Sequence, residues 1–188
     1  MGTVLLVAAT RLELCGHAGL ECGVGPVEAA AATSRALAGG PSLAVLHVGL
    51  AGAAGVPVGS LVVGTESRYD DIAAEWPVVD RVTPDQRLVD AVSTALPDAH
   101  SLPIRTSARV GGPRDPEPDT PVVEAMEGFG VLRAAALAGA PAVEVRAISN
   151  ELGEEDRGRW QVAAALERLG AALPSLVSAV EDAVRAVD

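Results

Sequence analysis

Short apolar runs alternate with alanine-rich segments along the chain, and this alternation most constrains the fold. Residues 3–9 (TVLLVAA) and 43–48 (LAVLHV) have the length and continuity of strands buried on both faces, as in parallel sheets. Between them, residues 27–37 are rich in alanine and follow Pro26, a residue favoured at the first position of a helix. The alternation predicts an α/β fold, a three-layer α/β/α sandwich with a mostly parallel, mixed central sheet.

The rest of the chain continues this pattern without an internal repeat or an interdomain linker. With 188 residues, we expect one domain over residues 1–188. Very small residues make up most of 49–55, residues 111–121 carry four prolines and two glycines, and both segments are predicted to be loops. Pro174 is expected to break or kink the last helix. The remaining predicted strands are 60–65, a part of 101–110 and 142–148, and the remaining predicted helices are 85–96, 122–138 and 160–187.

The composition excludes several classes of function. The formal net charge of −11, without a basic cluster, argues against nucleic acid or a membrane as a partner. All 14 basic residues are arginine, which excludes Schiff-base chemistry and a P-loop lysine. Aromatic residues make up 2% of the chain, too few for a platform that stacks single-stranded nucleic acid.

Cysteine and histidine spacing offers no metal or redox motif. Cys15 and Cys22 are not in a CxxC arrangement, so two reduced thiols are the simpler interpretation and a redox role is the alternative. The three histidines lack the spacing of metal ligands, and we expect neither a metal nor another cofactor. No basic stretch opens the chain and the apolar run 4–9 is too short for a signal peptide or a span, so we expect a cytoplasmic protein.

Two acidic residues are candidates for chemistry. Glu13 follows the first predicted strand, at the sheet edge where ligands bind in α/β folds. The alternative interpretation of Glu13 is a solvated glutamate in the first turn of a helix. Glu127 lies among apolar and small residues, where a buried carboxylate could accept hydrogen bonds from two vicinal sugar hydroxyls. The alternative is an amphipathic helix that leaves Glu124 and Glu127 in water.

Two further segments lie at the ends of predicted strands. The small residues 49–55 would let a ligand approach the backbone closely, although a turn that needs glycine explains them equally well. Ser149 and Asn150 follow the strand 142–148, at the same sheet edge as Glu13. Asparagine can donate and accept at once, which suits a group with an adjacent acceptor and N–H. A helix cap or an Asx turn is the alternative there.

Together and in this order, these segments resemble the purine nucleoside phosphorylase and nucleosidase superfamily. The resemblance spans nearly the whole chain, and VEAMEG followed by VRAISN is its most specific pair. The chain is most similar to one branch, the futalosine hydrolase family, because Asn150 stands where adenine-specific nucleosidases carry aspartate. Residues 146–160 (RAISNELGEEDRGRW) also resemble that branch's C-terminal signature. The other matching segments are 23–33 (GVGPVEAAAAT), 47–55 (HVGLAGAAG) and 58–64 (VGSLVVG).

This resemblance implies hydrolysis of the N-glycosidic bond of futalosine, with release of hypoxanthine, in menaquinone synthesis. It implies that Glu13 activates the attacking water and that Glu127 binds the ribose hydroxyls. Asn150 would contact the purine and stabilise charge on the departing base. Trp160 would contact the substrate, and the alternative is an ordinary core residue that packs at the start of a helix. The implied substrate-binding residues are Ala51, Gly52, Val110, Met126, Glu127, Ser149 and Trp160.

What the chain lacks favours water over phosphate as the nucleophile. Phosphorylases of the superfamily place an arginine before the small-residue segment, where this chain has LHVG at 46–49. The resemblance also implies a homo-oligomer with a small nucleoside as substrate. The carboxylate of futalosine would need a cation, for which Arg68, Arg109 and Arg114 are candidates. The alternatives are a methylthioadenosine/adenosylhomocysteine nucleosidase, a 6-oxopurine nucleoside phosphorylase and an inactive nucleoside-binding relative.

Overall fold

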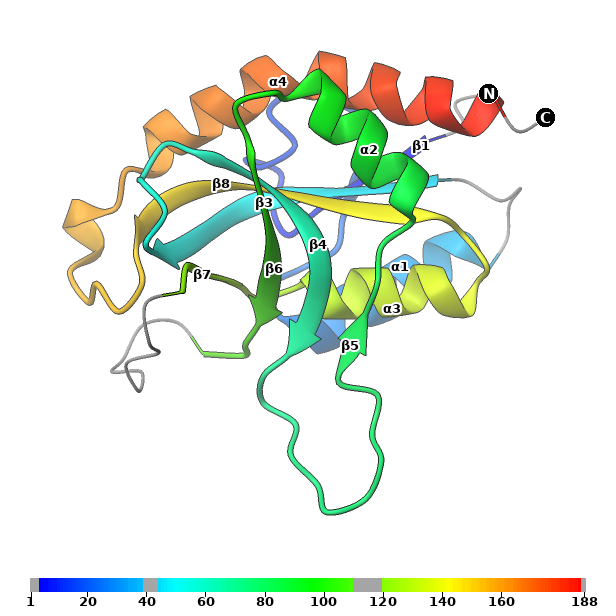
Figure 1. The fold of residues 1–188 in the computed structure, drawn as a ribbon, viewed down its shortest axis with the longest axis horizontal. Helices are drawn as coiled ribbons and strands as arrows, with labels where there is room; N and C mark the ends of the chain where they lie inside the picture. The colour runs from blue at the N-terminus through cyan, green and yellow to red at the C-terminus, as the bar shows by residue number, and fades with distance from the viewer. Residues whose placement is uncertain (1–3, 39–43, 110–119, 187–188) are drawn as a thin grey trace.

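A computed structural model describes residues 4–38, 44–109 and 120–186, and Figure 1 shows how its helices and strands are arranged. The strands are β1 (Val4–Ala8), β2 (Leu20–Glu21), β3 (Ala44–Ala54), β4 (Leu61–Tyr69), β5 (Arg81–Val82), β6 (His100–Thr106), β7 (Val122–Ala125) and β8 (Ala142–Glu151). The helices are α1 (Pro26–Leu37), α2 (Gln86–Ala95), α3 (Gly128–Leu137) and α4 (Val162–Arg185), with a short 3₁₀ helix at Arg157–Arg159.

The central sheet is mixed, and part of it closes on itself. Strands β2, β1, β3 and β8 pair in parallel, as do β4, β6 and β7. Antiparallel pairing joins β3 to β7 and β8 to β4, so that β3, β7, β6, β4 and β8 form a ring, and β5 adds to β4. An apolar cluster with members on every strand of this ring forms its core: Ala51, Ala53, Val62, Ile104, Val123, Ala125 and Ile148.

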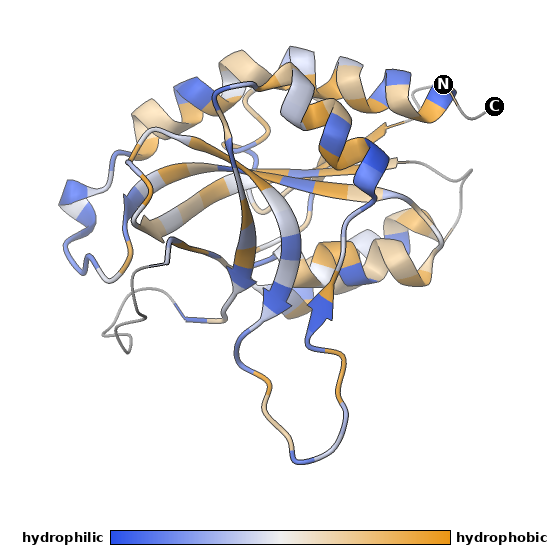
Figure 2. Cartoon of the chain, in the orientation of Figure 1, coloured by the Kyte–Doolittle hydropathy of each residue, from blue (hydrophilic) through white to orange (hydrophobic). Residues whose placement is uncertain are grey.

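Two pairs of helices cover the two faces of the sheet, which confirms the predicted three-layer α/β/α fold. Helices α2 and α4 lie on one face and α1 and α3 on the other (Figure 1). Hydrophobic and polar residues alternate along α4 in Figure 2, as expected for an amphipathic helix. By length and composition α4 could cross a membrane, but its apolar stripe packs on the sheet and α2. That buried stripe consists of Ala165, Leu169, Leu173, Leu176 and Val180.

The structure corrects two of the predicted boundaries near the middle of the chain. Most of the predicted loop 49–55 belongs to β3, which runs on to Ala54 because β7 and β8 pair with it there. The predicted helix 122–138 begins instead as β7, where Val122 and Val123 are β-branched and pair with β3. The helix starts only at Gly128, so Glu127 occupies the turn between β7 and α3.

Near the C-terminal end, two further expectations differ from the structure. Strand β8 continues past 148 to Glu151, so Ser149 and Asn150 lie within a strand and not in a helix cap. Pro174 lies inside α4, which continues unbroken on both sides of it. Of the predicted loop 111–121, residues 111–119 lie outside the described residues.

Candidate active site

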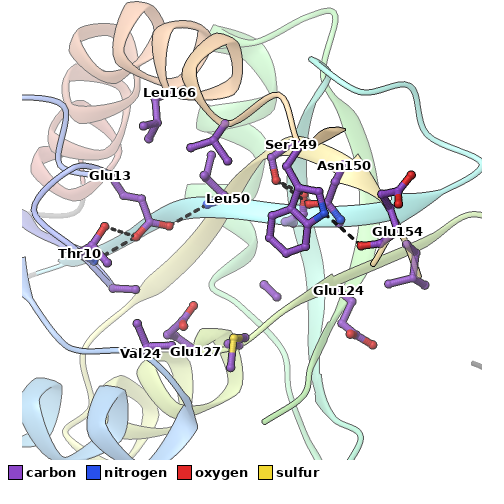
Figure 3. A pocket seen from close by; sticks show the side chains of 18 of the residues that line it. Thr10, Glu13, Val24, Leu50, Glu124, Glu127, Ser149, Asn150, Glu154 and Leu166 are labelled. Atoms are coloured by element: carbon purple, nitrogen blue, oxygen red, sulfur yellow. Dashed lines mark hydrogen bonds between the residues drawn. The ribbon is translucent and has the colours of Figure 1, made fainter. Parts of the chain in front are cut away.

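A cavity of about 300 Å³ opens where β1, β3 and β8 end. That volume is at the lower end of the roughly 300–1,000 Å³ that ligand pockets occupy. Its walls also come from the turn after β1, from β7, from the turn before α3 and from the first turns of α4. Figure 3 shows Glu13 and Asn150 on opposite sides of this space, with Glu127 below. The cavity lies where parallel α/β folds bind ligands, at the carboxyl ends of strands.

The cavity brings together all the predicted site residues that the structure describes. Val110 lies outside the described residues, so its predicted role stays a prediction. The others come from four separate stretches of the chain, and Figure 3 labels four of them, Glu13, Glu127, Ser149 and Asn150. The predicted site residues that line the cavity are Glu13, Ala51, Gly52, Met126, Glu127, Ser149, Asn150 and Trp160.

Glu13 is held by three hydrogen-bond donors and is 8% exposed, not solvated. The backbone N–H and hydroxyl of Thr10 donate to its Oε2 at 3.0 and 2.8 Å. The backbone N–H of Leu50, on β3, donates to Oε1 at 3.0 Å. A carboxylate has about four acceptor positions, so one remains for a molecule in the cavity. This arrangement can orient and deprotonate a water.

Glu127 is also buried, at 4% exposure, but has fewer protein partners. Its Oε1 accepts from the backbone N–H of Gly25 at 3.2 Å, and its Oε2 accepts from Nη1 of Arg146 at 3.4 Å. Burial raises the pKa of Glu127, and the positive charge of Arg146 opposes that shift. About two acceptor positions therefore remain on this carboxylate, enough for two neighbouring hydroxyls.

Arg146 is the centre of a fully buried polar network behind the cavity. Its Nε donates to Oε1 of Glu144 at 2.8 Å, and its Nη2 contacts Nε2 of His47. The other ring nitrogen of His47 lies 3.1 Å from the carbonyl oxygen of Val7, so Nδ1 donates there and Nε2 accepts from Arg146. Burial, followed by the charge of Arg146, lowers the pKa of His47 well below its ordinary value and keeps the imidazole neutral.

An irregularity in β8 explains why two consecutive residues line the same cavity. Ala51 pairs with Ile148, but Gly52 pairs with Asn150, so Ser149 is the extra residue of a β-bulge. The Ser149 hydroxyl lies 2.7 Å from Oδ1 of Asn150, and Nδ2 of Asn150 donates to the carbonyl of Glu151 at 2.9 Å. One N–H of the Asn150 amide therefore remains for a ligand.

Trp160 and three arginines differ in how they relate to the cavity. Trp160 lines the cavity, and its indole Nε1 donates to the carbonyl of Glu154 at 3.1 Å. Arg109 also lines the cavity. Arg68 is not among the lining residues and pairs with Glu66 on β4, while Arg114 lies outside the described residues.

The cysteines and histidines of the described segments form neither a metal site nor a disulfide. No group of three or more His, Cys, Asp or Glu side chains in the described ranges is arranged to hold a metal ion. Cys15 and Cys22 are both free thiols. Burial and the nearby charge of Glu127 raise the pKa of Cys22 to about 12, which keeps this thiol protonated.

Sequence reasoning assigned no role to His47, Glu144 or Arg146. The signal was present, because each is a polar or charged residue inside a run of apolar strand residues (LAVLHV and AVEVRAI). Buried charges are rare unless they are paired, so such positions indicate partners inside the molecule. What the sequence lacked was the register, in which His47 lies opposite Glu144 and Gly49 opposite Arg146.

Comparisons with known proteins identify the class to which this site belongs. A family model described as the phosphorylase superfamily matches residues 15–114, and the chain belongs to that superfamily. A futalosine hydrolase of Streptomyces coelicolor is 38% identical over 186 residues, which cover 86% of this chain and 79% of the relative. One of Acidothermus cellulolyticus is 47% identical over 58 residues, 31% of this chain and 24% of the relative. Within the superfamily, the chain belongs to the futalosine hydrolase family, and this confirms the resemblance predicted from the sequence.

Solved structures support the fold. A 5′-methylthioadenosine/S-adenosylhomocysteine nucleosidase from Colwellia psychrerythraea in complex with adenine has a TM-score of 0.79 and 18% identity, with 95% of each chain covered. A D198N mutant of the Helicobacter pylori enzyme with 5′-methylthioadenosine has a TM-score of 0.79 and 16% identity, with 95% of this chain and 99% of that chain covered. At these identities the similarity establishes a shared architecture.

Proposed function

We propose that the protein is an N-ribosyl hydrolase that releases hypoxanthine from futalosine, with water as the nucleophile. One observation carries the proposal: Glu13, Glu127 and Asn150 come from distant parts of the sequence and line a single cavity. The similarity to a futalosine hydrolase over most of the chain supports the choice of substrate. On this proposal the protein acts in the futalosine route to menaquinone.

The reaction breaks the bond between C1′ of the ribose and N9 of hypoxanthine. The bonding electrons leave with the purine, positive charge develops on the ribose ring, and the water oxygen bonds to C1′. Glu13 orients that water through its remaining acceptor position and takes its proton. The free N–H of Asn150 donates to the purine and stabilises negative charge on the departing base.

The ribose is held by the carboxylate of Glu127. Its two remaining acceptor positions suit the 2′ and 3′ hydroxyls, and its negative charge stabilises the growing positive charge of the ring. Residues of β3, of β8, of the turn before α3 and of the segment before α4 complete the pocket. Met126 packs on the ribose, Ala51 and Gly52 offer backbone beside the base, Ser149 orients Asn150, and Trp160 lies near the 5′ substituent.

Water is favoured over phosphate by the charges that face the cavity. Among the described residues that line it, Arg109 is the one basic side chain, while Glu13, Glu124, Glu127 and Glu154 are acidic. A phosphate dianion would need several donors from cations. Arg146 cannot supply them, because its side chain is fully buried against Glu144.

Arg109 is the cation that we assign to the carboxylate of the futalosine side chain. It lines the cavity and is exposed, whereas Arg68 is paired with Glu66 outside it. Replacing Arg109 by alanine should raise KM for futalosine about tenfold or more, because a charge-assisted hydrogen bond is lost. Inosine lacks this carboxylate, so binding of inosine to the variant should be unchanged.

The protein is also proposed to be a cytoplasmic homo-oligomer. Two free cysteines are compatible with a reducing compartment. Large apolar side chains are exposed both beside the cavity, at Leu12 and Val24, and on the segment between β4 and β5, at Trp76. Such exposed apolar groups are typical of surfaces that another subunit covers.

The proposed function is tested by incubating the pure protein with futalosine, inosine and methylthioadenosine, each with and without phosphate. Free base is followed by chromatography. Release of hypoxanthine from futalosine, at the same rate without phosphate, supports the proposal. Turnover only with phosphate would indicate a phosphorylase, release of adenine from methylthioadenosine would indicate an adenine-specific nucleosidase, and binding without release would indicate an inactive relative.

A further inference from the structure

Glu144 is a buried carboxylate that the mechanism above does not use. It is 0% exposed, and among the described residues its Oε2 has no hydrogen-bond partner. Leaving a buried acceptor unpaired costs stability, and apolar residues of similar volume often replace buried ion pairs without loss. A buried ion pair of this kind is weak evidence for a contribution to stability, and a role in the adjacent site explains this carboxylate better.

The two ion pairs of Arg146 differ in length. The contact with Glu144 is 2.8 Å, within the range of a strong charge-assisted hydrogen bond, whereas the contact with Glu127 is 3.4 Å. Glu144 therefore holds the guanidinium closely, and Glu127, which faces the cavity, is only loosely paired. His47 fixes the Nη2 side of the same group, which leaves Nη1 to Glu127 and the carbonyl oxygen of Leu50.

Two glycines make this close arrangement possible. A Cβ added at Gly128 would lie 2.3 Å from both carboxylate oxygens of Glu144, so only glycine lets the start of α3 approach them. A Cβ added at Gly49 would lie 2.4 Å from Nη1 of Arg146 and 2.8 Å from Oε1 of Glu13. The guanidinium thus approaches both cavity carboxylates through space that the backbone leaves open.

We propose that Glu144 and His47 are positioning residues of the active site, which hold Arg146 back from Glu127 so that the Glu127 carboxylate stays available to the ribose hydroxyls. The inference rests on the proposed function, because it concerns the group that binds the ribose there. Glu144 acts through charge, by competing with Glu127 for the guanidinium. His47 acts through orientation, since its neutral imidazole accepts from Nη2 without adding charge.

Removing the charge of Glu144 should have two effects on Glu127. Arg146 would move towards Glu127 and occupy acceptor positions that the ribose needs. The negative charge of Glu144 raises the pKa of Glu127, so its loss should lower that pKa. The groups that face Glu127 are Arg146 and Glu144 on β8, Glu13 in the turn after β1, Cys22 after β2 and the N–H of Gly25 before α1, while His47 on β3 contacts Arg146.

The test is the Glu144→Gln variant, which keeps the shape and an acceptor for Nε of Arg146. We expect kcat/KM for futalosine to fall about tenfold. We also expect the acidic limb of its pH profile to move to lower pH, by up to about one unit. Glu66→Gln, which removes an ion-paired carboxylate on β4 outside the cavity, is the matched control and should change neither quantity. A folded Glu144→Gln enzyme whose kcat/KM and whose acidic limb of the pH profile both equal those of wild type would overturn the proposal.

A second variant and a direct titration cover the other outcomes. In His47→Gln the orientation of Arg146 is lost, so kcat/KM should fall. Because one neutral group replaces another, the acidic limb of the pH profile should move less than in Glu144→Gln. Wild-type kcat/KM in a folded His47→Gln enzyme would remove His47 from the proposal.

If the wild-type protein releases no base from futalosine, the proposed function fails, but the role of Glu144 is still measurable. The carboxyl carbon of Glu127, assigned by its loss in Glu127→Gln, is then titrated by NMR. A titration midpoint that does not fall in Glu144→Gln overturns the proposal.

Discussion

At the scale of single residues, Glu13 shows how a local turn positions the proposed catalytic base. Thr10 supplies two of its three donors from the same turn, and Leu50 ties it to β3. The carboxylate is thus fixed before substrate arrives, with one acceptor position facing the cavity. In the proposed mechanism this position accepts a proton during catalysis, whereas substrate binding does not require it to do so.

Glu13→Gln should therefore lower kcat by about 10²–10⁴-fold with little change in KM. The amide fills the same space and can still accept from Leu50, but it cannot take the proton of water. Initial rates of hypoxanthine release over a range of futalosine concentrations separate the two parameters. Glu167→Gln, an exposed position on α4, is the control. A kcat close to that of wild type would exclude Glu13 as the base.

Glu127 carries an expected conflict between stability and activity. Burial raises its pKa in the folded protein, so its ionisation weakens folding as the pH rises through that raised value. Below the pKa of the unfolded chain the carboxyl is protonated in both states and has no such effect. The same ionised group is needed to bind the ribose in the proposed mechanism.

The Glu127→Gln variant should therefore melt about 2–4 °C higher than wild type at pH 8, which corresponds to a rise of ~1 kcal/mol in the free energy of unfolding. Its turnover of futalosine should fall. At pH 4 the difference in melting temperature should shrink. Thermal melting followed by circular dichroism at both pH values measures this, with Glu167→Gln as the control. A variant that melts below wild type at pH 8 would show that the pairing with Arg146 outweighs the desolvation of Glu127.

Single residues also show how far the sequence could predict the site. Glu13, Glu127 and Asn150 were recognisable because their residue types and order match a superfamily pattern, and all three line the cavity. Arg146 and Glu144 were not assigned a role, because nothing in the run VEVRAI says which buried partner faces each charge. That information lies in the pairing of β8 with β3.

At the scale of elements, strand ends were the hardest features to predict. Small residues at 49–55 resemble a loop, yet they continue β3 because strands on both sides supply hydrogen-bond partners. Residues 122–125 resemble the start of a helix, yet they pair as β7 with β3 and β6. In both cases long-range pairing decides the structure, whereas β1, α1 and α2 follow from their local pattern.

The close contact of β3 with the polar network gives a prediction at this scale. Gly49→Ala places a methyl group on Nη1 of Arg146 and Oε1 of Glu13, which must both shift. We expect a loss of about 1–3 kcal/mol in stability from overpacking and a larger loss of activity than that instability explains. Gly158→Ala in the 3₁₀ helix is the control, because its methyl group meets the exposed side chain of Asp156, which does not line the cavity, at 3.1 Å. Wild-type turnover in Gly49→Ala would contradict this account.

At the scale of the whole molecule, the layers place the cavity on one edge of the sheet. The parallel strands β1, β3 and β8 all end there, and α3 and α4 begin beside it. The alternation of strands and helices predicted this arrangement, since it needs only the order of the elements. The closed ring of five strands was not predicted, because it depends on the two antiparallel joins between β3 and β7 and between β4 and β8.

The segment between β4 and β5 gives a prediction about assembly. It projects from the body of the molecule in Figure 1 and exposes Trp76 to 69% and Val79 to 50%. Apolar side chains on a projecting segment are stable in water when a partner covers them. We therefore expect a mass in solution that is at least twice the 19.0 kDa of one chain.

Trp76→Ser should shift the protein towards the monomer, whereas Leu137→Ser, an equally exposed position at the end of α3, should not. Light scattering coupled to size-exclusion chromatography measures these masses, and a wild-type protein that elutes as a monomer at micromolar concentration would refute the proposed assembly.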